Sequence, residues 1–597
     1  MATSIARQAI ECLPAMTQWP FRSAMWRALA LVLCIAPSAS PASAGAPADL
    51  VVTDGKVLTV DAGFRVAEAV AIRDGVFVLV GTSAEARALV GPRTRVIDAG
   101  GKTVIPGLID SHVHALGVAE AETRGAFRDL RTIAEIQTWL REKTAAVPEG
   151  QWVFSPRVFP TRLAERRLPT RAELDAAAPR HPVVVDAAYA LMVNTAALQA
   201  AGIGPDTPSP RGGAIVKDEQ GRPTGLLRNV GGLLDRFQGP RRPERLLPAL
   251  TDVHRRYNEA GITSVIERAA DLAGYRAYAQ LRAEGRPRVR ATVTLRVDSD
   301  GTVEGTEAFL RSLPLRPGEG DDLLRVGALK IFADGGILAG TAFMREPYGP
   351  AAAPLYGVAD PSYRGFLTIA ADKIRNIVRT GHRLGWQMCA HVTGDAGVDT
   401  VLDAFAAADA DRSIRDRRFT LIHAYFPTPE VARRAAALGV AVDTQPAWYY
   451  KDADALLPAL GEPRLRPFLG IAEWLRAGVK VVLNTDHMFG VAPDASLNPY
   501  NPFLTLSVAV TRRTEGGQII GPEQAVSRED ALRMMTANAA WLSFEEARKG
   551  SIEVGKLGDL VVLSDDYLAC PPERIRKIRA AVTVLGGTVV HEAAGRR

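Results

Sequence analysis

The chain has little cysteine and few aromatic residues for its length of 597 residues. Its four cysteines are too few and too scattered for the disulfide framework of a small secreted domain. A net charge of +6 is small for this length, and no basic run is interleaved with aromatics, so the composition argues against a nucleic-acid-binding protein. The 53 glycines and 39 prolines are spread along the chain, as is typical of turn positions, and no segment has low complexity.

The apolar run near the start, residues 28–36, is too short to span a bilayer, so no stable membrane insertion is expected. Two arginines precede it, and Ala42-Ser43-Ala44 follows as a small-x-small cleavage pattern. Residues 1–44 therefore predict a cleavable signal peptide and an exported, periplasmic or secreted protein; the alternative is a disordered extension. Met25 begins a more ordinary signal peptide than Met1, and the sequence leaves the true start open.

Short β-type segments dominate both ends of the remaining chain. Residues 45–104 contain three of them with a hairpin signal at Asp74-Gly75, and residues 548–597 repeat this style. We expect one small β-sandwich built from both termini, packed beside a catalytic domain at residues 105–547.

The middle of the chain alternates β-type runs with helical patterns, such as the helix predicted after Thr428 as N-cap and Pro429 as first residue. This alternation predicts an α/β fold, a (β/α)8 barrel, in which catalytic groups sit at the C-terminal strand ends. An insertion at about residues 120–250, after the first strand, is too long and too structured for a loop and is expected to cap the catalytic face. The eight predicted strands end near His112, Glu267, Arg296, Ala333, His391, His423, Gln445 and Asp486.

Two histidines stand one residue apart at the end of the first of these strands. Alternate residues of a strand point to the same face, so His112 and His114 project together. An isolated His-x-His is as often coincidental, with ring nitrogens satisfied by backbone carbonyls. Here His391, His423 and Asp486 each close a further strand, and together these side chains form a ligand set suited to zinc.

These segments resemble the amidohydrolase superfamily, and within it amidohydrolase family 3, the YtcJ-like metal-dependent hydrolases that include N-substituted formamide deformylase. The similarity covers residues 48–594 and rests on PGLIDSHVH, PTGLLRN, GITSV, LKIFADGG, HVTGDAGVD, LIHA, LNTD and GSIEVGKLGDLVVL in combination. It implies one or two Zn²⁺ ions, or another divalent metal. The implied metal ligands are His112, His114, Lys330, His391, His423 and Asp486.

The resemblance also implies that Lys330 can be carboxylated, which replaces a cation that would repel the metal by an anionic oxygen ligand. The alternative is a salt bridge from Lys330 to Asp334, turned away from the metal. Two segments depart from the family pattern. Tyr189 stands where an imidazole is common, and residues 155–160 read SPRVFP instead of a Gly-Trp pair. Both lie in the insertion, so they bear on substrate identity.

The predicted reaction is hydrolysis of a carbon-nitrogen bond of the amide or formamide type by metal-activated water. Asp486 is the predicted general base and His423 an assisting catalytic group; the alternative for Asp486 is a helix or loop cap. Tyr189, Asp334 and Trp448 are candidate substrate-binding residues. Asp334 and Asp395 have a competing interpretation as loop-fixing turn residues, and Trp448 one as a packing residue.

Two other functions fit the same residues. The first is another amidohydrolase reaction, namely opening of a cyclic amide, deamination or ester hydrolysis; the second is a non-catalytic exported binding protein. The expected partner is a small-molecule substrate, and the sequence leaves a homodimer open. His487 is expected to point away from the metal, and four further histidines are expected to be structural or exposed: His181, His254, His382 and His591.

Overall fold

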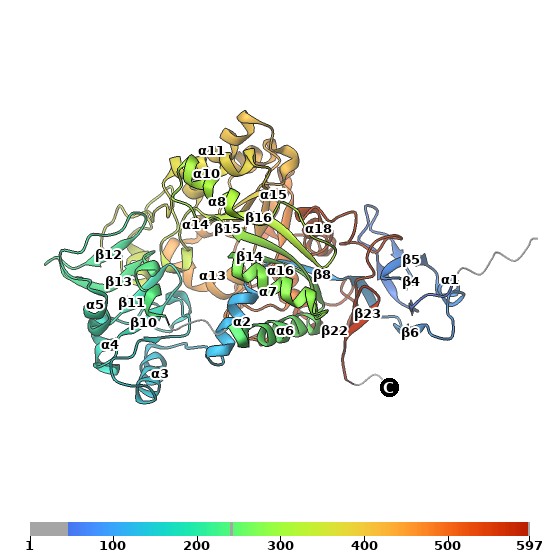
Figure 1. Ribbon diagram of the computed structural model, residues 1–597, viewed down its shortest axis with the longest axis horizontal. Helices are drawn as coiled ribbons and strands as arrows, with labels where there is room; N and C mark the ends of the chain where they lie inside the picture. Colours follow the sequence, from blue (N-terminus) through green and yellow to red (C-terminus); the bar gives the residue numbers. More distant parts are fainter. Residues whose placement is uncertain (1–45, 239–242, 595–597) are drawn as a thin grey trace, which may run out of the picture. The chain divides into compact units, whose positions relative to one another are not determined.

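The structure is a computed structural model that describes residues 46–238 and 243–594 (Figure 1). The predicted signal peptide lies outside the described residues, so its cleavage stays a prediction. Cys389 and Cys570 are both buried and form no disulfide. Among the described helices, none combines the length and the apolarity needed to cross a bilayer.

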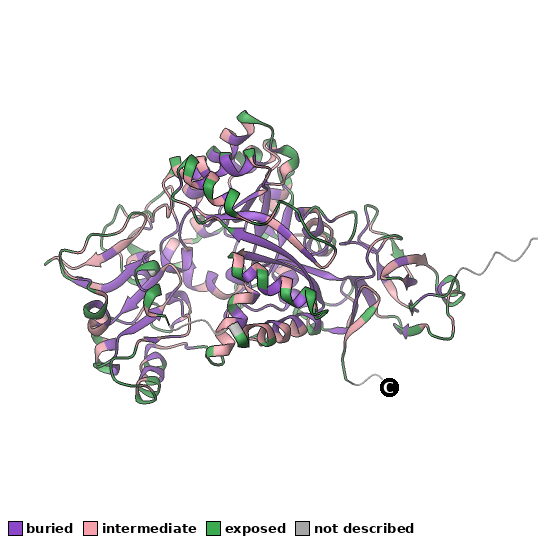
Figure 2. Cartoon of the chain, viewed as in Figure 1, coloured by how far each residue is buried: buried purple, intermediate pink, exposed green. Residues whose placement is uncertain are grey.

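Eight parallel strands form the central sheet and follow one another around it in chain order. The sheet closes where Val113 pairs in parallel with His487, and the His114 N–H donates to the His487 carbonyl at 3.0 Å. The strands are largely buried (Figure 2), as expected where helices cover the outside and side chains fill the inside. They are β8 (Leu108–Val113), β14 (Ile262–Ala270), β15 (Arg290–Arg296), β16 (Leu324–Phe332), β17 (Met388–Val392), β18 (Thr420–His423), β19 (Ala441–Thr444) and β20 (Val481–Leu483).

The predicted (β/α)8 barrel is thus confirmed, with each strand at its predicted place. Thr428 caps the helix after β18 as predicted, accepting a hydrogen bond from the Val431 N–H. The helices that alternate with or follow the strands are α2 (Ala115–Arg124), α6 (Pro243–Glu259), α7 (Leu272–Ala283), α8 (Val303–Ser312), α10 (Ala371–Arg383), α11 (Asp395–Asp411), α12 (Pro429–Ala437), α15 (Ile471–Arg476), α17 (Arg528–Met534) and α18 (Ala537–Leu542). Further helices are α9 (Ala353–Tyr356), α13 (Pro446–Leu460), α14 (Glu462–Leu465) and α16 (Pro502–Thr511).

The N-terminal strands form one small sheet by themselves and join the C-terminal strands in a second, and the two sheets share one apolar core. The link is β7, which pairs in antiparallel fashion with β21 from the other end of the chain. Asp74 and Gly75 both adopt positive φ, as the predicted hairpin turn requires. The first sheet holds β1 (Leu50–Thr53), β4 (Ala69–Arg73), β5 (Val76–Gly81) and β6 (Arg95–Asp98), with α1 (Ser83–Arg87) beside it; the second holds β2 (Lys56–Leu58), β3 (Val66–Ala67), β7 (Thr103–Pro106), β21 (Leu560–Leu563), β22 (Ala580–Leu585) and β23 (Thr588–Glu592). The predicted domain boundaries stay a prediction, because residues 46–597 group as one compact unit.

The insertion after the first barrel strand forms a five-stranded sheet with cores of its own. A buried, bidentate ion pair between Arg162 of the insertion and Asp452 on α13 connects it to the barrel, with nitrogen–oxygen distances of 2.9 and 2.7 Å. Tyr189, between two of its strands, reaches His391 at the barrel rim. The elements are α3 (Ile133–Ala145), β9 (Val153–Phe154), α4 (Arg171–Ala177), β10 (Val183–Asp186), β11 (Ala190–Val193), α5 (Thr195–Ala201), β12 (Ala214–Lys217) and β13 (Pro223–Arg228).

Candidate metal centre and active site

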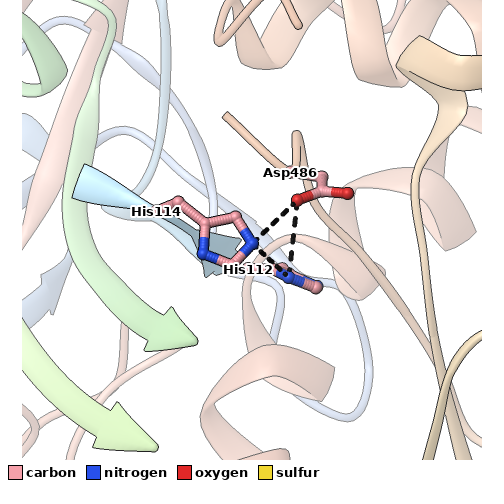
Figure 3. Close-up of side chains that lie close together, drawn as sticks. All are labelled: His112, His114 and Asp486. Atoms are coloured by element: carbon pink, nitrogen blue, oxygen red, sulfur yellow. Dashed lines mark hydrogen bonds and ion pairs between the residues drawn. The ribbon is translucent and has the colours of Figure 1, made fainter. Parts of the chain in front are cut away.

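His112 on β8, His114 directly after this strand and Asp486 after β20 lie close together (Figure 3). The Nε2 atoms of His112 and His114 are 3.3 Å apart. The Asp486 Oδ1 lies 3.4 Å from each of them. A tetrahedral zinc ion with ligand distances of about 2.1 Å has its ligand atoms about 3.4 Å apart, so these three atoms have the spacing of one face of such a site.

The bonding of Asp486 also fits a cation. Its Oδ2 accepts a hydrogen bond from the Trp448 Nε1 at 2.9 Å, whereas Oδ1 is buried without a hydrogen-bond partner among the described residues. A buried carboxylate oxygen in that state is costly unless a cation or donor faces it. Burial opposes ionisation of Asp486, but the contact with His114 and the neighbouring His423 and Lys330 side chains outweigh it and hold the pKa well below its ordinary value.

A second pair of ligand candidates, His391 and His423, lies beside this group. The His391 Nδ1 and the His423 Nε2 are 2.8 Å apart, and the ring centres of His112 and His423 are 5.6 Å apart. Burial lowers the pKa of His423 to about 4 and holds that of His391 well below its ordinary value, so both imidazoles are neutral, as metal ligands must be. The predicted ligands therefore converge, but as two neighbouring groups of three and two residues.

Lys330 on β16 points into this centre. Its Nζ is 3.2 Å from the His112 Nε2 and stands over the Phe332 ring. Complete burial lowers its pKa to about 8, which leaves a neutral amine accessible near neutral pH. Within the described residues it forms no ion pair with Asp334, so the salt-bridge alternative is not supported; carboxylation stays a prediction.

The carboxylate of Asp334 is used by the protein itself, and its predicted part in substrate binding stays a prediction. Its carboxylate is fully buried and accepts hydrogen bonds from the N–H groups of Phe343, Thr393 and Gly394 at 2.8–2.9 Å. These bonds hold two loops at the barrel rim, and Asp334 lines no part of the cavity beside the metal centre. Its competing interpretation, a loop-fixing turn residue, is the one the structure supports. Asp395 likewise accepts from backbone N–H groups.

A cavity of about 400 Å³ opens from the candidate metal ligands toward the insertion. Tyr189 and Trp448 line it, as predicted. The neighbouring Tyr449 does not line it; its hydroxyl hydrogen-bonds the main-chain carbonyl oxygens of Arg512 and Ile520. The walls are mainly aromatic and apolar. Besides the candidate ligands, the lining side chains include Arg157, Phe159, Phe332, Ile337, Leu338, Tyr425, Met488 and Phe489.

Several residues of the site were not predicted from the sequence. Arg157 and Phe159 lie in the SPRVFP segment, whose departure from the family pattern was a usable signal. Asp443 lies near the His112 ring, and Gln445 contacts the His423 ring. The sequence did not indicate these contacts, because the pattern of a short apolar strand does not show which side chains point into the barrel. His487 was correctly excluded as a ligand, since its ring nitrogens contact Tyr257 and Gly490.

Comparison with known proteins agrees with this geometry. The sequence profile of the amidohydrolase family matches residues 95–591. The chain is 30% identical over 570 residues to N-substituted formamide deformylase of Arthrobacter pascens, covering 92% of this chain and 99% of that protein. It is 27% identical over 548 residues to the putative amidohydrolase YtcJ of Bacillus subtilis, covering 88% and 96%.

Among solved structures, an uncharacterized metal-dependent hydrolase from Pyrococcus horikoshii superposes with a TM-score of 0.64 at 22% identity, covering 88% of this chain and 99% of that one. That likeness shows the fold, and the family match extends over most of the chain. With a barrel, a candidate divalent-metal centre and the family profile in agreement, the chain belongs to the amidohydrolase family and is a metal-dependent hydrolase.

Proposed function

We propose that the protein hydrolyses a carbon-nitrogen bond of the amide or formamide type in a small molecule. The observation that carries this proposal is the Asp486 carboxylate, which lines a mainly apolar cavity. One of its oxygens faces the His112 and His114 Nε2 atoms, and the other is held by Trp448. The similarity to N-substituted formamide deformylase supports this bond class.

The residues that would hold zinc are His112, His114 and Asp486 in one group and His391 and His423 in the other. Lys330, whose Nζ is 3.2 Å from the His112 Nε2, would be a further ligand when carboxylated. The chemistry that a bound divalent ion supplies here is Lewis acidity, which polarises a carbonyl and lowers the pKa of water from about 15.7 toward 7.

Asp486 is placed to move the proton. Because its pKa lies below the ordinary range, it is ionised at rest and can accept a proton from the attacking water. Its bond from Trp448 holds one carboxylate oxygen, while the other faces the two histidines, and the residue lines the cavity. The same carboxyl then delivers the proton to the leaving nitrogen, which departs as a neutral amine.

The cavity walls act on the substrate. Phe159, Trp448 and Phe489 give the substituent an apolar surface and exclude water. Arg157, held by Asp186 at 2.9 Å and stacked on the Phe489 ring, is a cation in that wall. The Tyr189 hydroxyl, 3.3 Å from the His391 Nδ1, is a donor that can reach a carbonyl oxygen of the substrate.

A substrate panel tests the proposal. Zinc-loaded protein is assayed with formamides, N-acyl amino acids, cyclic imides and aryl esters, alongside Asp486→Asn and a matched surface control, Asp411→Asn. We expect turnover of a formamide or amide that falls about 10²–10⁴-fold in Asp486→Asn and is unchanged in the control. Turnover of cyclic imides or esters alone would replace the bond class. Ligand binding without turnover of any compound would favour a binding protein, and equal activity in Asp486→Asn would remove this residue from the mechanism.

We also propose that the protein is exported and cleaved after Ala44. The supporting feature is the small-x-small pattern that follows the short apolar run. Mass spectrometry of the protein from the native host should find a mature chain beginning at Gly45. A periplasmic or secreted fraction with an intact first segment, or recovery from the cytoplasm alone, would contradict it.

A further inference from the structure

The strand β19 contributes no candidate metal ligand. Asp443, near the end of this strand, and Gln445, just after it, each lie close to a candidate ligand histidine. Asp443 lies 3.9 Å from the His112 Nδ1, which is too far for a hydrogen bond. Gln445, just beyond the strand end, lies much closer to its histidine: its side-chain Oε1 is 2.6 Å from the His423 Nδ1. Both residues are fully buried. The contact of Gln445 is therefore the one that can act on a ligand directly.

The orientation of the Gln445 amide follows from its other contact. Its Nε2 is 3.0 Å from the main-chain carbonyl oxygen of Asp443, which can only accept a hydrogen bond. The amide NH₂ must therefore face that carbonyl, and the amide oxygen must face His423. Because that oxygen can only accept, the proton of the neutral His423 ring has to sit on Nδ1, which leaves the lone pair on Nε2.

The neighbouring histidine is oriented by a similar bond. The His391 Nε2 is 3.1 Å from the carbonyl oxygen of Gly335, so its proton sits on Nε2 and its Nδ1 carries the lone pair. With both protons placed, the two atoms that face each other at 2.8 Å, His391 Nδ1 and His423 Nε2, are both electron-pair donors. Two lone pairs at that distance repel unless a cation or a proton lies near both, and the Tyr189 hydroxyl, 3.3 Å from the His391 Nδ1, is one donor beside them. Because 2.8 Å is shorter than the roughly 3.4 Å between ligand atoms of a tetrahedral zinc ion, a bound metal would hold the two rings slightly farther apart.

A competing arrangement exists and shows what Gln445 prevents. The Tyr425 hydroxyl is 3.0 Å from the His423 Nδ1 and could donate to it. The ring would then carry its proton on Nε2 and donate it to the His391 Nδ1, which would satisfy both histidines without metal. Gln445 opposes this state because its oxygen would face an unprotonated Nδ1. The Tyr425 hydroxyl instead donates to the Gln445 Oε1 at 3.2 Å.

We infer that Gln445 is a positioning residue that fixes the metal-binding tautomer of His423. It acts through His423 without touching substrate, and the inference rests on the proposed metal centre. Removing a side chain that hydrogen-bonds a metal-ligating histidine typically changes metal affinity by about 10–100-fold. That range sets the expected effect.

The test is the affinity of metal-free protein for zinc, measured by competition with a chromogenic chelator. Gln445→Leu should bind zinc at its weakest site about 10–100-fold less tightly than wild type. Gln445→Glu keeps an acceptor toward the His423 Nδ1 but loses the donor to the Asp443 carbonyl, so it should bind zinc more tightly than Gln445→Leu. Tyr425→Phe, which removes the competing donor, should bind at least as tightly as wild type. Gln524→Leu is the matched control, because Gln524 is also a buried glutamine and accepts a hydrogen bond from the Glu473 N–H on α15. This substitution should not alter zinc affinity.

The outcomes separate this inference from the proposed function. If wild type binds no zinc, the metal centre itself fails. If wild type binds zinc and Gln445→Leu binds it equally well, or if Tyr425→Phe weakens binding as much as Gln445→Leu, the tautomer role is wrong. Should Gln445→Leu fail to fold, ¹⁵N-histidine spectra of metal-free wild type decide the point, since they must show His423 protonated on Nδ1; a proton on Nε2 would overturn the inference.

Discussion

Replacing Trp448 by phenylalanine tests how the general base is held. The indole Nε1 donates to the Asp486 Oδ2 at 2.9 Å, and both side chains are buried. Phenylalanine keeps an aromatic ring against Phe159, with which Trp448 now makes an edge contact, but it removes the donor. The substitution therefore frees one oxygen of the carboxylate while the other keeps its neighbours.

The size of the effect follows from the kind of bond that is lost. A hydrogen bond to an ionised group contributes about 1.5–3 kcal/mol, which corresponds to roughly 10–150-fold in rate if the bond acts in the transition state. Losing the donor also raises the pKa of Asp486, because the charged form loses a partner. Since the carboxylate must be ionised to accept a proton, the acid limb of the pH profile should move to higher pH.

The assay is kcat/KM against pH for the zinc-loaded variant, with zinc content and thermal midpoint measured on the same sample. We expect a fall of at least tenfold, an acid limb displaced upward and unchanged zinc. Trp386→Phe, a change at another buried tryptophan that does not line the cavity, controls for loss of ring volume. An unaltered rate and profile in Trp448→Phe would show that this bond does not position the base.

Three further changes test other parts of the structure. His112→Ala should lose zinc and turnover together, whereas His487→Ala should retain zinc by metal analysis; equal zinc in both would refute the ligand set. Burial raises the pKa of Glu267 from 4.5 to about 8, so the native state keeps a proton that the unfolded state releases, and stability falls as pH rises from 4.5 to 8. Glu267→Gln lacks this loss, and its advantage in urea unfolding should be about 3 kcal/mol larger at pH 9 than at pH 6; a pH-independent difference would contradict the raised pKa. Arg162→Met leaves Asp452 buried and unpaired, so the unfolding free energy should drop by about 3–5 kcal/mol and recover in part with Asp452→Asn; no loss would mean that this ion pair does not anchor the insertion.

The barrel was predictable because its strands are buried on both faces. Such strands appear in sequence as short continuous apolar runs, and the rule that catalytic groups sit at their C-terminal ends then places His112, His391 and His423 on one rim. The sandwich was predictable for a related reason, since its hairpin needs positive φ at Asp74 and Gly75, which an Asp-Gly pair signals. In both cases local pattern and tertiary structure agree.

For Asp334 the local pattern allowed two answers, and the structure supports the loop-fixing one. An Asp-Gly-Gly turn beside a catalytic strand is compatible with a substrate contact and with a loop-fixing carboxylate. The choice depends on N–H groups of Phe343, Thr393 and Gly394, which approach only in the folded barrel. Gln445 was missed for the same reason, because its importance comes from the atoms it faces.

Two candidate metal ligands have an unfavourable backbone conformation. His423 and Asp486 both adopt positive φ, 77° and 48°, in a region that non-glycine residues rarely occupy. For Asp486 the conformation is held by side-chain amides: its N–H donates to the Asn484 Oδ1 and its carbonyl accepts from the Asn498 Nδ2, each at 3.1 Å. The strand-end rule placed Asp486 at the same rim as the histidines, but it gave no sign of the positive φ with which the carboxylate faces them. The hydrogen bonds to and from the buried amides of Asn484 and Asn498 offset part of the cost of this backbone conformation.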